Sequence, residues 1–291
     1  MQDIAKTHNG IIKTGISNAE YHADRSSFSS SILKMMNCPA KAKWEIENPS
    51  PRTETLALGS AIHKWILERD QFNEEFLIGI DRARRSKDDR QAWADWYSER
   101  GADGNVVIDR PAAEWNAEFE RQTGKNMVTP DTLKMLIDMA DAVASNPNAN
   151  ELISKGVAEQ SVYWTDDETG LNLRCRPDYM NAEFISDLKS AAEIDDRAII
   201  RAVANFSYSL SQGMYQQGVY EATGQWRPFL FIFVEKSPPY QCRVISLDEA
   251  AAIAGYEKYR EAARILKTCI DTGEWPGYKD NLNFQLPEWA L

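Results

Sequence analysis

The sequence has little cysteine and little histidine, and this scarcity removes several classes of site. Four cysteines are spread over 291 residues without a C-x-x-C pair, at Cys38, Cys175, Cys242 and Cys269. Zinc ribbons and disulfide frameworks need closely spaced cysteines, so neither is indicated. Only three histidines are present and no Gly-x-Ser-x-Gly elbow occurs, which argues against a serine hydrolase. We expect buried thiols in a reducing compartment.

Long apolar runs and a phosphate-binding loop are also missing. No stretch approaches the roughly 20 apolar residues that cross a bilayer. Residues 1–13 lack the apolar core of a signal peptide. We therefore expect a cytoplasmic protein with no membrane partner. Because no Gly-x-x-x-x-Gly-Lys-Ser/Thr occurs, the chain is not expected to use ATP.

Positive charge is in deficit, with a net charge of −11. A protein that coats nucleic acid nonspecifically needs clustered lysine and arginine to neutralise phosphates, so the charge disfavours that class. A nuclease is compatible with it, because carboxylates hold the metal and only a local basic groove is required. A hydrophobic content of 43% suffices for one sizeable core.

The predicted elements follow the order of an α/β chain with a mixed sheet flanked by helices. We expect a flexible segment over residues 1–14, one domain over 15–291, a helical N-terminal part, and a helical insertion over 81–122. Apolar periodicity and caps predict the elements. Helices are predicted over 39–47, 55–68, 88–99, 130–145, 195–223 and from a Ser246/Glu249 capping box to Gly273; strands are predicted over 158–164, 171–180, 184–189, 228–235 and 241–245. The first three strands are predicted to form a β-meander.

Two acids and a lysine stand on the adjacent predicted strands, in Arg176-Pro-Asp178 and Ser186-Asp-Leu-Lys189. Residues two apart in a strand face the same side, so Asp187 and Lys189 project together while Leu188 faces the core. Converging carboxylates with an open side suit a hard cation such as Mg²⁺, with Mn²⁺ as an alternative. A lysine beside that metal can orient a water or stabilise developing charge.

A plainer interpretation is that Asp178 caps a turn and that Asp187 with Lys189 forms a surface ion pair. Against it, the strand around Asp187 is apolar, and charges inside a buried sheet are rarely kept without a partner or a metal. Glu159 is a candidate third acid, with Glu151 and Glu183 as alternatives.

At this point the chain resembles the RecE (exonuclease VIII) exonucleases of the PD-(D/E)XK nuclease superfamily. The resemblance covers roughly residues 15–291. It rests on matching motifs in matching order, namely Gly15-Ile-Ser-Asn-Ala-Glu-Tyr-His22, Leu58-Gly-Ser-Ala-Ile-His63, Cys175-Arg-Pro-Asp178, Asp187-Leu-Lys189, Glu274-Trp-Pro276 and Leu286-Pro-Glu-Trp289. The predicted element order is also close to the core of that superfamily.

The resemblance implies the site residues. His63, Glu159, Asp178 and Asp187 would hold the metal together with the Leu188 carbonyl, and Lys189 would be catalytic. Taken by itself, a histidine on an apolar helix face is more often a core residue than a ligand, but the Gly-x-x-x-His match favours a ligand.

The family also implies a Gln and a Tyr four residues apart, whereas Gln212 precedes Tyr215 by three. Gln216 and Tyr220 have the expected spacing, and Gln212 could instead form a capping box with Ser209. Related nucleases that carry an iron-sulfur cluster have closely spaced cysteines, so none is expected here.

As function, the resemblance implies an ATP-independent exonuclease that degrades one strand of linear duplex DNA from 5′ to 3′. The remaining 3′ strand would pass to an annealing protein of the RecT type, and the enzyme would act as a homo-oligomeric ring such as a tetramer. An endonuclease of the same fold and a catalytically silent DNA-end-binding module are the alternatives. The Arg82 to Arg90 cluster could grip phosphates or be a solvated helix face.

Overall fold

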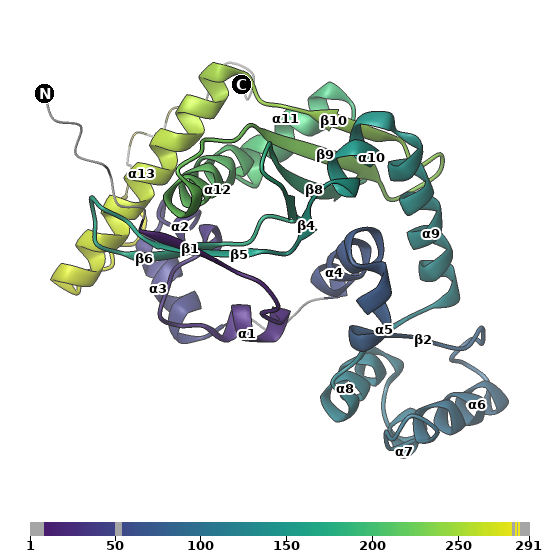
Figure 1. Ribbon diagram of the computed structural model, residues 1–291. Coiled ribbons are helices and arrows are strands. Elements are labelled where there is room, and N and C mark those ends of the chain that lie inside the picture. Colours follow the sequence, from purple (N-terminus) through teal and green to yellow (C-terminus); the bar gives the residue numbers. More distant parts are fainter. Residues whose placement is uncertain (1–8, 50–53, 281–282, 284, 286–291) are drawn as a thin grey trace, which may run out of the picture.

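A five-stranded mixed sheet forms the centre of the computed structural model, which describes residues 9–49, 54–280, 283 and 285 (Figure 1). Its strand order is β10 (Cys242–Ile245), β9 (Phe229–Glu235), β8 (Ile185–Ala191), β7 (Tyr179–Met180) and β4 (Val157–Ala158). β8 and β9 are parallel, and the other neighbours are antiparallel. The predicted fold class, a mixed sheet flanked by helices, is confirmed.

A second sheet joins β1 (Gly10–Lys13), β5 (Ser161–Thr165) and β6 (Asn172–Cys175) in antiparallel order. The prediction of a flexible segment over residues 1–14 is therefore wrong for residues 10–13, and residues 1–8 lie outside the described part. A Cβ on Gly10 would lie 2.6 Å from the backbone nitrogen of Ala222, so glycine lets the strand pass close to a helix.

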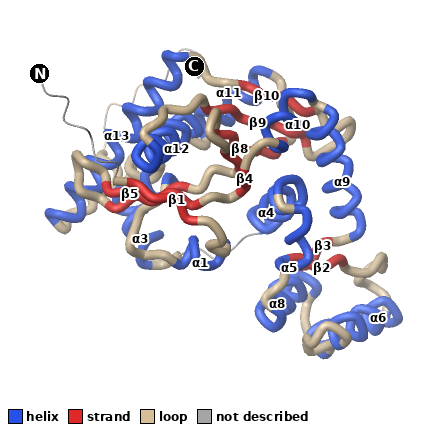
Figure 2. The backbone as a smooth tube through the Cα atoms, in the orientation of Figure 1, coloured by secondary structure: helices blue, strands red, loops and turns tan. Residues whose placement is uncertain are grey.

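The predicted β-meander is wrong in one respect, because each of its first two strands is interrupted. The predicted strand 158–164 divides at Glu159, whose φ of 52° lies in the left-handed region. The predicted strand 171–180 divides at Arg176-Pro177-Asp178, and Pro177 has no N–H for a ladder hydrogen bond. At the first break the chain passes from β4 in the central sheet to β5 in the second sheet (Figure 2). At the second break it returns from β6 in the second sheet to β7 in the central sheet.

Helices cover both faces of the central sheet (Figure 1). One face carries α11 (Asp196–Asn205), α12 (Tyr208–Thr223) and α13 (Glu249–Thr272), and the other carries α4 (Glu54–Leu67), α9 (Pro130–Ser145) and α10 (Pro147–Ser154). Side chains alternate along β8, so Ile185 faces the hydrophobic core on the α12 side of the sheet and Leu188 faces the core on the α4 and α9 side. None of the described helices is long and apolar enough to cross a membrane.

Two helix predictions need correction. The predicted helix 195–223 is divided by a turn at Ser207, whose φ is 49°. The predicted capping box at Ser246 is absent, because the Asp248 side chain caps α13 by accepting a hydrogen bond from the Ala251 N–H.

Three helices form the N-terminal part, and the second and third of them pack against α13. They are α1 (Asn18–Ala23), α2 (Ser30–Leu33) and α3 (Pro39–Glu47). Ser17 and Glu20 form a capping box that starts α1, and Pro39 starts α3 at its first position. The Ala40 N–H donates to the Pro276 carbonyl at 3.1 Å, so the closing motif around Trp275 returns to α3. The Leu286-Pro-Glu-Trp289 motif lies outside the described residues.

Residues 69–128 form a projection beside α4 and α9 (Figure 1). It contains η1 (Arg69–Gln71), α5 (Phe72–Glu75), β2 (Phe76–Ile78), α6 (Lys87–Ser98), α7 (Asn105–Asp109), α8 (Ala112–Thr123) and β3 (Asn126–Val128), and β2 and β3 are parallel. Its helices enclose a separate aromatic core around Trp93, Tyr97, Trp115 and Phe119. The predicted helix 88–99 is confirmed as α6, and the predicted insertion 81–122 lies between β2 and β3.

Candidate metal centre

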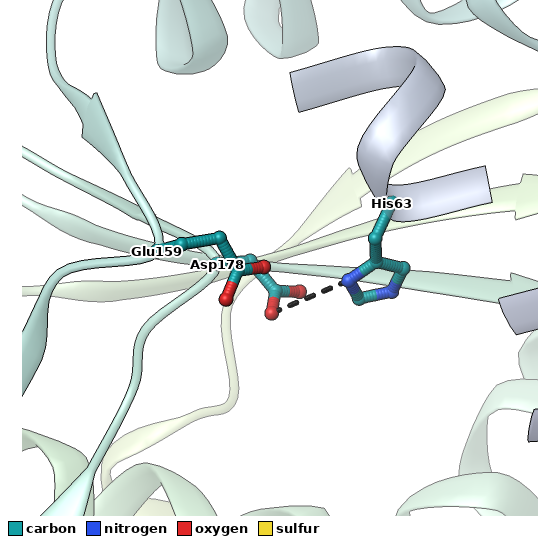
Figure 3. Close-up of side chains that lie close together, drawn as sticks. All are labelled: His63, Glu159 and Asp178. Atoms are coloured by element: carbon teal, nitrogen blue, oxygen red, sulfur yellow. Dashed lines mark ion pairs between the residues drawn. The ribbon is translucent and has the colours of Figure 1, made fainter. Parts of the chain in front are cut away.

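The paired breaks in the strands bring two carboxyl groups together. The Glu159 N–H donates to the Asp178 carbonyl at 3.1 Å, which fixes one break against the other. His63 approaches from α4, with its Nδ1 3.4 Å from Asp178 Oδ1 (Figure 3). One ligand atom from each of His63, Glu159 and Asp178 lies within 4.8 Å of the other two. These three side chains can therefore share one cation.

Asp187 and Lys189 reach the same place from β8. They pair in register with Phe231 and Phe233 of β9 and lie on the sheet face that packs against α12. Lys189 Nζ is 2.5 Å from Asp187 Oδ2 and 4.0 Å from Asp178 Oδ2. Both aspartates are over 90% buried. Asp187 and Lys189 do form an ion pair, but it is largely buried and not the surface pair of the plainer interpretation.

The Leu188 backbone faces Asp178. Its N–H donates to Asp178 Oδ2 at 2.6 Å. The N–H and C=O of one strand residue point to the same edge, so the Leu188 carbonyl is directed to the cluster as well. Lys189 Nζ donates to it at 3.4 Å. The structure thus brings Asp187, Leu188 and Lys189 next to Asp178, which itself lies beside His63 and Glu159.

A cavity of about 340 Å³ opens from His63, Glu159 and Asp178 toward the N-terminal helices. Polar side chains from α1, α2 and α4 line it, among them Asn18, Ser30 and Lys64. The sequence analysis did not single these residues out. Of the three, only Asn18 lies in a motif found in the sequence, the Gly15–His22 motif.

The Arg176 guanidinium joins segments that lie next to the site. Its Nε and Nη2 donate to Ser161 Oγ at 2.9 and 2.7 Å, and Nη2 also donates to the Ile16 carbonyl at 3.1 Å. Its guanidinium lies 4.1 Å from the centroid of the Tyr21 ring. Arg176 thereby ties the segment before α1 to the strand break that contains Asp178.

Residues 28–285 match the family described as PDDEXK-like domain of unknown function (DUF3799). The chain belongs to this family. A candidate exonuclease from Eubacterium rectale has a similar fold, with a TM-score of 0.60 and 14% identity over 95% of this chain and 96% of that one. An alkaline exonuclease from Laribacter hongkongensis is 16% identical over 62% of this chain and 99% of that one, with a TM-score of 0.24. A search of curated proteins gives no match.

The PDDEXK signature corresponds to Pro177-Asp178 and Asp187-Leu188-Lys189, and its carboxyl groups have divergent pKa values. Burial would raise the pKa of Asp178, but His63 and Lys189 together hold it below its usual range. Burial and the neighbouring Asp178 raise the pKa of Asp187 to about 7. Burial and Asp178 likewise raise the pKa of Glu159 to about 8.

The cationic groups respond in the opposite sense to burial. Burial would lower the pKa of Lys189, but Asp187 and Asp178 raise it overall. Burial would lower the pKa of His63 as well, and Asp178 reverses the shift. At neutral pH these two cations therefore leave Glu159 protonated, and additional positive charge at the site would favour ionisation of all three carboxyl groups.

The donor set fits a divalent cation, which PD-(D/E)XK nucleases use. Carboxylate oxygens and a backbone carbonyl are hard ligands, and an imidazole is accepted by several metals. The raised pKa values of Glu159 and Asp187 mark the positions where a cation would displace protons.

The structure separates the alternatives for the Gln and Tyr positions. Tyr215 lines the cavity, and Gln212 is buried on the same helix with an Oε1 that accepts no hydrogen bond from the described residues. Gln216 instead donates to the Arg227 carbonyl at 2.7 Å, and Tyr220 packs against Trp226. Because Ser209 lies inside α12, it cannot form the alternative capping box with Gln212.

The other acids considered do not reach the cavity. Glu151 pairs with Lys155 at 2.6 Å on the surface, and Glu183 is exposed. Part of the Arg82 to Arg90 cluster has structural contacts, because the Arg84 guanidinium lies over the rings of Trp93 and Trp115, at 4.6 and 5.2 Å from their centroids.

Proposed function

We propose that this protein is a divalent-metal-dependent nuclease that hydrolyses DNA phosphodiester bonds. The main support for this proposal is that Asp178, Asp187 and Lys189 converge with His63 and Glu159 at the junction of two sheets. This set combines oxygen ligands, a lysine and an adjacent cavity in a PDDEXK-like fold.

His63, Glu159, Asp178, Asp187 and the Leu188 carbonyl would hold the metal. A bound divalent cation polarises the phosphate and lowers the pKa of a coordinated water. Lys189 keeps its proton, because Asp187 and Asp178 raise its pKa, and it can donate a hydrogen bond to the attacking water or to the developing phosphorane charge. Asp187 holds the Lys189 ammonium in position through their 2.5 Å ion pair.

Within this class we propose an ATP-independent exodeoxyribonuclease that acts with Mg²⁺, or Mn²⁺, on the ends of double-stranded DNA. It would remove one strand from 5′ to 3′ and leave a 3′ strand for a RecT-type annealing protein, as a ring-shaped homo-oligomer. Similarity of the motifs to RecE-type exonucleases supports this proposal, as does the similar fold of the candidate exonuclease from Eubacterium rectale.

The test compares linear with closed-circular duplex DNA, each in Mg²⁺ without ATP. The linear DNA carries a label at its 5′ or 3′ end. We expect early loss of the 5′ label, no attack on the circle, and no cleavage by Asp187→Ala. The exposed Glu193→Gln variant is the matched control and should cleave at the parental rate.

Other outcomes identify the alternatives. Nicking of the closed-circular DNA would show that the protein is an endonuclease of the same fold and not an exonuclease. Retarded but uncut DNA with both the parent and Asp187→Ala would indicate a DNA-end-binding module without chemistry.

A further inference from the structure

Three aromatic rings form a continuous stack from the surface to the core beside Lys189. Phe206 is 59% exposed, and its ring lies 5.6 Å from that of Tyr208 with an interplanar angle of 26°. Tyr208 in turn lies 5.9 Å from the buried Phe231, at 29°. Phe231 is the register partner of Asp187. The stack therefore begins in solvent and ends directly beside the candidate metal centre.

The turn that presents Phe206 is held in an unusual conformation. Ser207 has a φ of 49°, in the left-handed region that non-glycine residues rarely adopt. The Phe206 N–H still donates to the Ala202 carbonyl at 3.0 Å, and α12 begins immediately at Tyr208. Two helices thus fix the position of an exposed aromatic ring, which a mobile loop would not do.

Two lysines flank the middle ring of the stack. Lys189 Nζ is 5.4 Å from the centroid of the Tyr208 ring, and Lys34 Nζ is 5.7 Å from it. Lys34 follows α2, whose serines line the cavity. Burial, and then the proximity of Lys189, lower the pKa of Lys34 to about 8. An anionic group at this place would relieve the repulsion between the two ammonium groups.

We propose that Phe206, supported by Tyr208, is a stacking platform for an unpaired nucleobase next to the scissile phosphate, and that Lys34 contacts a phosphate of the same strand. This inference rests on the proposed nuclease function and adds its substrate form, a frayed or single-stranded DNA terminus. Aromatic side chains stack on any base, and cations beside them track the backbone. Isolated exposed apolar side chains are common. Phe206 differs because its stack continues to the site and carries two cations.

The test measures binding and stacking without cleavage, in the Asp187→Asn background with Ca²⁺. The probe is a short duplex with a single-stranded end that carries 2-aminopurine, whose fluorescence falls when it stacks on an aromatic ring. We expect Phe206→Ala to raise Kd roughly 10-fold and to abolish the protein-induced quenching, and Phe206→Trp to retain both. Lys34→Gln should weaken binding and leave the quenching at saturation unchanged.

Trp226→Ala is the matched control, because Trp226 is 52% exposed and packs on Tyr220 toward the other end of α12, about 18 Å along the helix from Tyr208. It should bind and quench as the parent does. Equal binding and quenching by Phe206→Ala would overturn the platform while leaving the nuclease function intact. A parent that neither binds this probe nor cleaves any DNA would overturn both.

Discussion

Glu159 and Asp187 keep their protons to unusually high pH in the metal-free protein, and for Glu159 this links stability to pH. Its pKa is raised from 4.5 to about 8 in the folded chain. The folded state therefore binds this proton more tightly than the unfolded state does. The stability that this group contributes is fully present below pH 4.5 and is lost progressively as the pH rises toward 8.

Replacement of Glu159 by Gln should remove this dependence. At pH 8 without divalent metal, Glu159→Gln is expected to raise the free energy of unfolding by up to about 4 kcal/mol, which corresponds to several degrees in Tm. At pH 5 the difference should nearly vanish. Thermal melts at both pH values measure it, with the exposed Glu193→Gln variant as control. A destabilised Glu159→Gln variant at pH 8 would contradict the prediction.

Lys189 permits a separation of chemistry from metal binding. Its ammonium contacts two candidate ligands, Asp187 and Asp178, so its removal abolishes a competing positive charge. Lys189→Met should lower the cleavage rate by about 10²- to 10³-fold while it binds Mn²⁺ as tightly as the parent or more tightly. Calorimetry with Mn²⁺ and single-turnover cleavage provide the two measurements. Parallel loss of both properties would instead assign Lys189 a structural role.

At the scale of elements, α12 and α13 lie side by side (Figure 1), and their backbones pack closely together. A Cβ on Gly255 would lie 2.3 Å from the Ser209 carbonyl oxygen, and one on Gly213 would lie 2.7 Å from Tyr256 Cα. Both obstacles are backbone atoms, which cannot rotate away. The two glycines therefore set the position of the helix that carries Gln212 and Tyr215.

Gly255→Ala should separate these helices and destabilise the protein by at least ~2 kcal/mol. Gly59→Ala is the helical control, because a Cβ there meets nothing within 4 Å, and it should add a few tenths to ~1 kcal/mol. Denaturant unfolding measures both. A Gly255→Ala variant as stable as the parent would show that the crossing can widen without cost.

At the scale of the whole molecule, the projection has a core of its own. Trp93, Trp115 and Phe119 belong to a cluster separate from the two clusters that cover the central sheet. We therefore expect it to unfold locally when its own packing is damaged. Trp115 is fully buried in that cluster, and its Nε1 donates to the Arg110 carbonyl at 3.1 Å.

Trp115→Ala should remove about 3–5 kcal/mol of local packing. Hydrogen exchange should then show lost amide protection over residues 87–123 and unchanged protection in β8 and β9. Phe231→Ala is the reciprocal variant, because it damages the core beneath the central sheet. Loss of protection in β8 and β9 on Trp115→Ala would mean that the projection and the sheet unfold as one unit.

Local chemistry in the sequence determined much of this protein. Pro39, Pro130 and Gly273 mark helix ends where the structure has them, and alternation along residues 185–189 places Asp187 and Lys189 on one face. These features depend on backbone preferences and side-chain periods within a few residues, so a sequence carries them without knowledge of the fold.

Only the tertiary structure decided where the strands break and which acid reaches the cluster. Residues 158–164 are predicted as one strand, yet the chain turns at Glu159, whose N–H pairs with the carbonyl of Asp178 nineteen residues later. Likewise β1 is ordered by pairing with β5, and His63 reaches Asp178 from a distant helix. Such contacts join residues far apart in the chain, and their free energy comes from packing that local sequence does not encode.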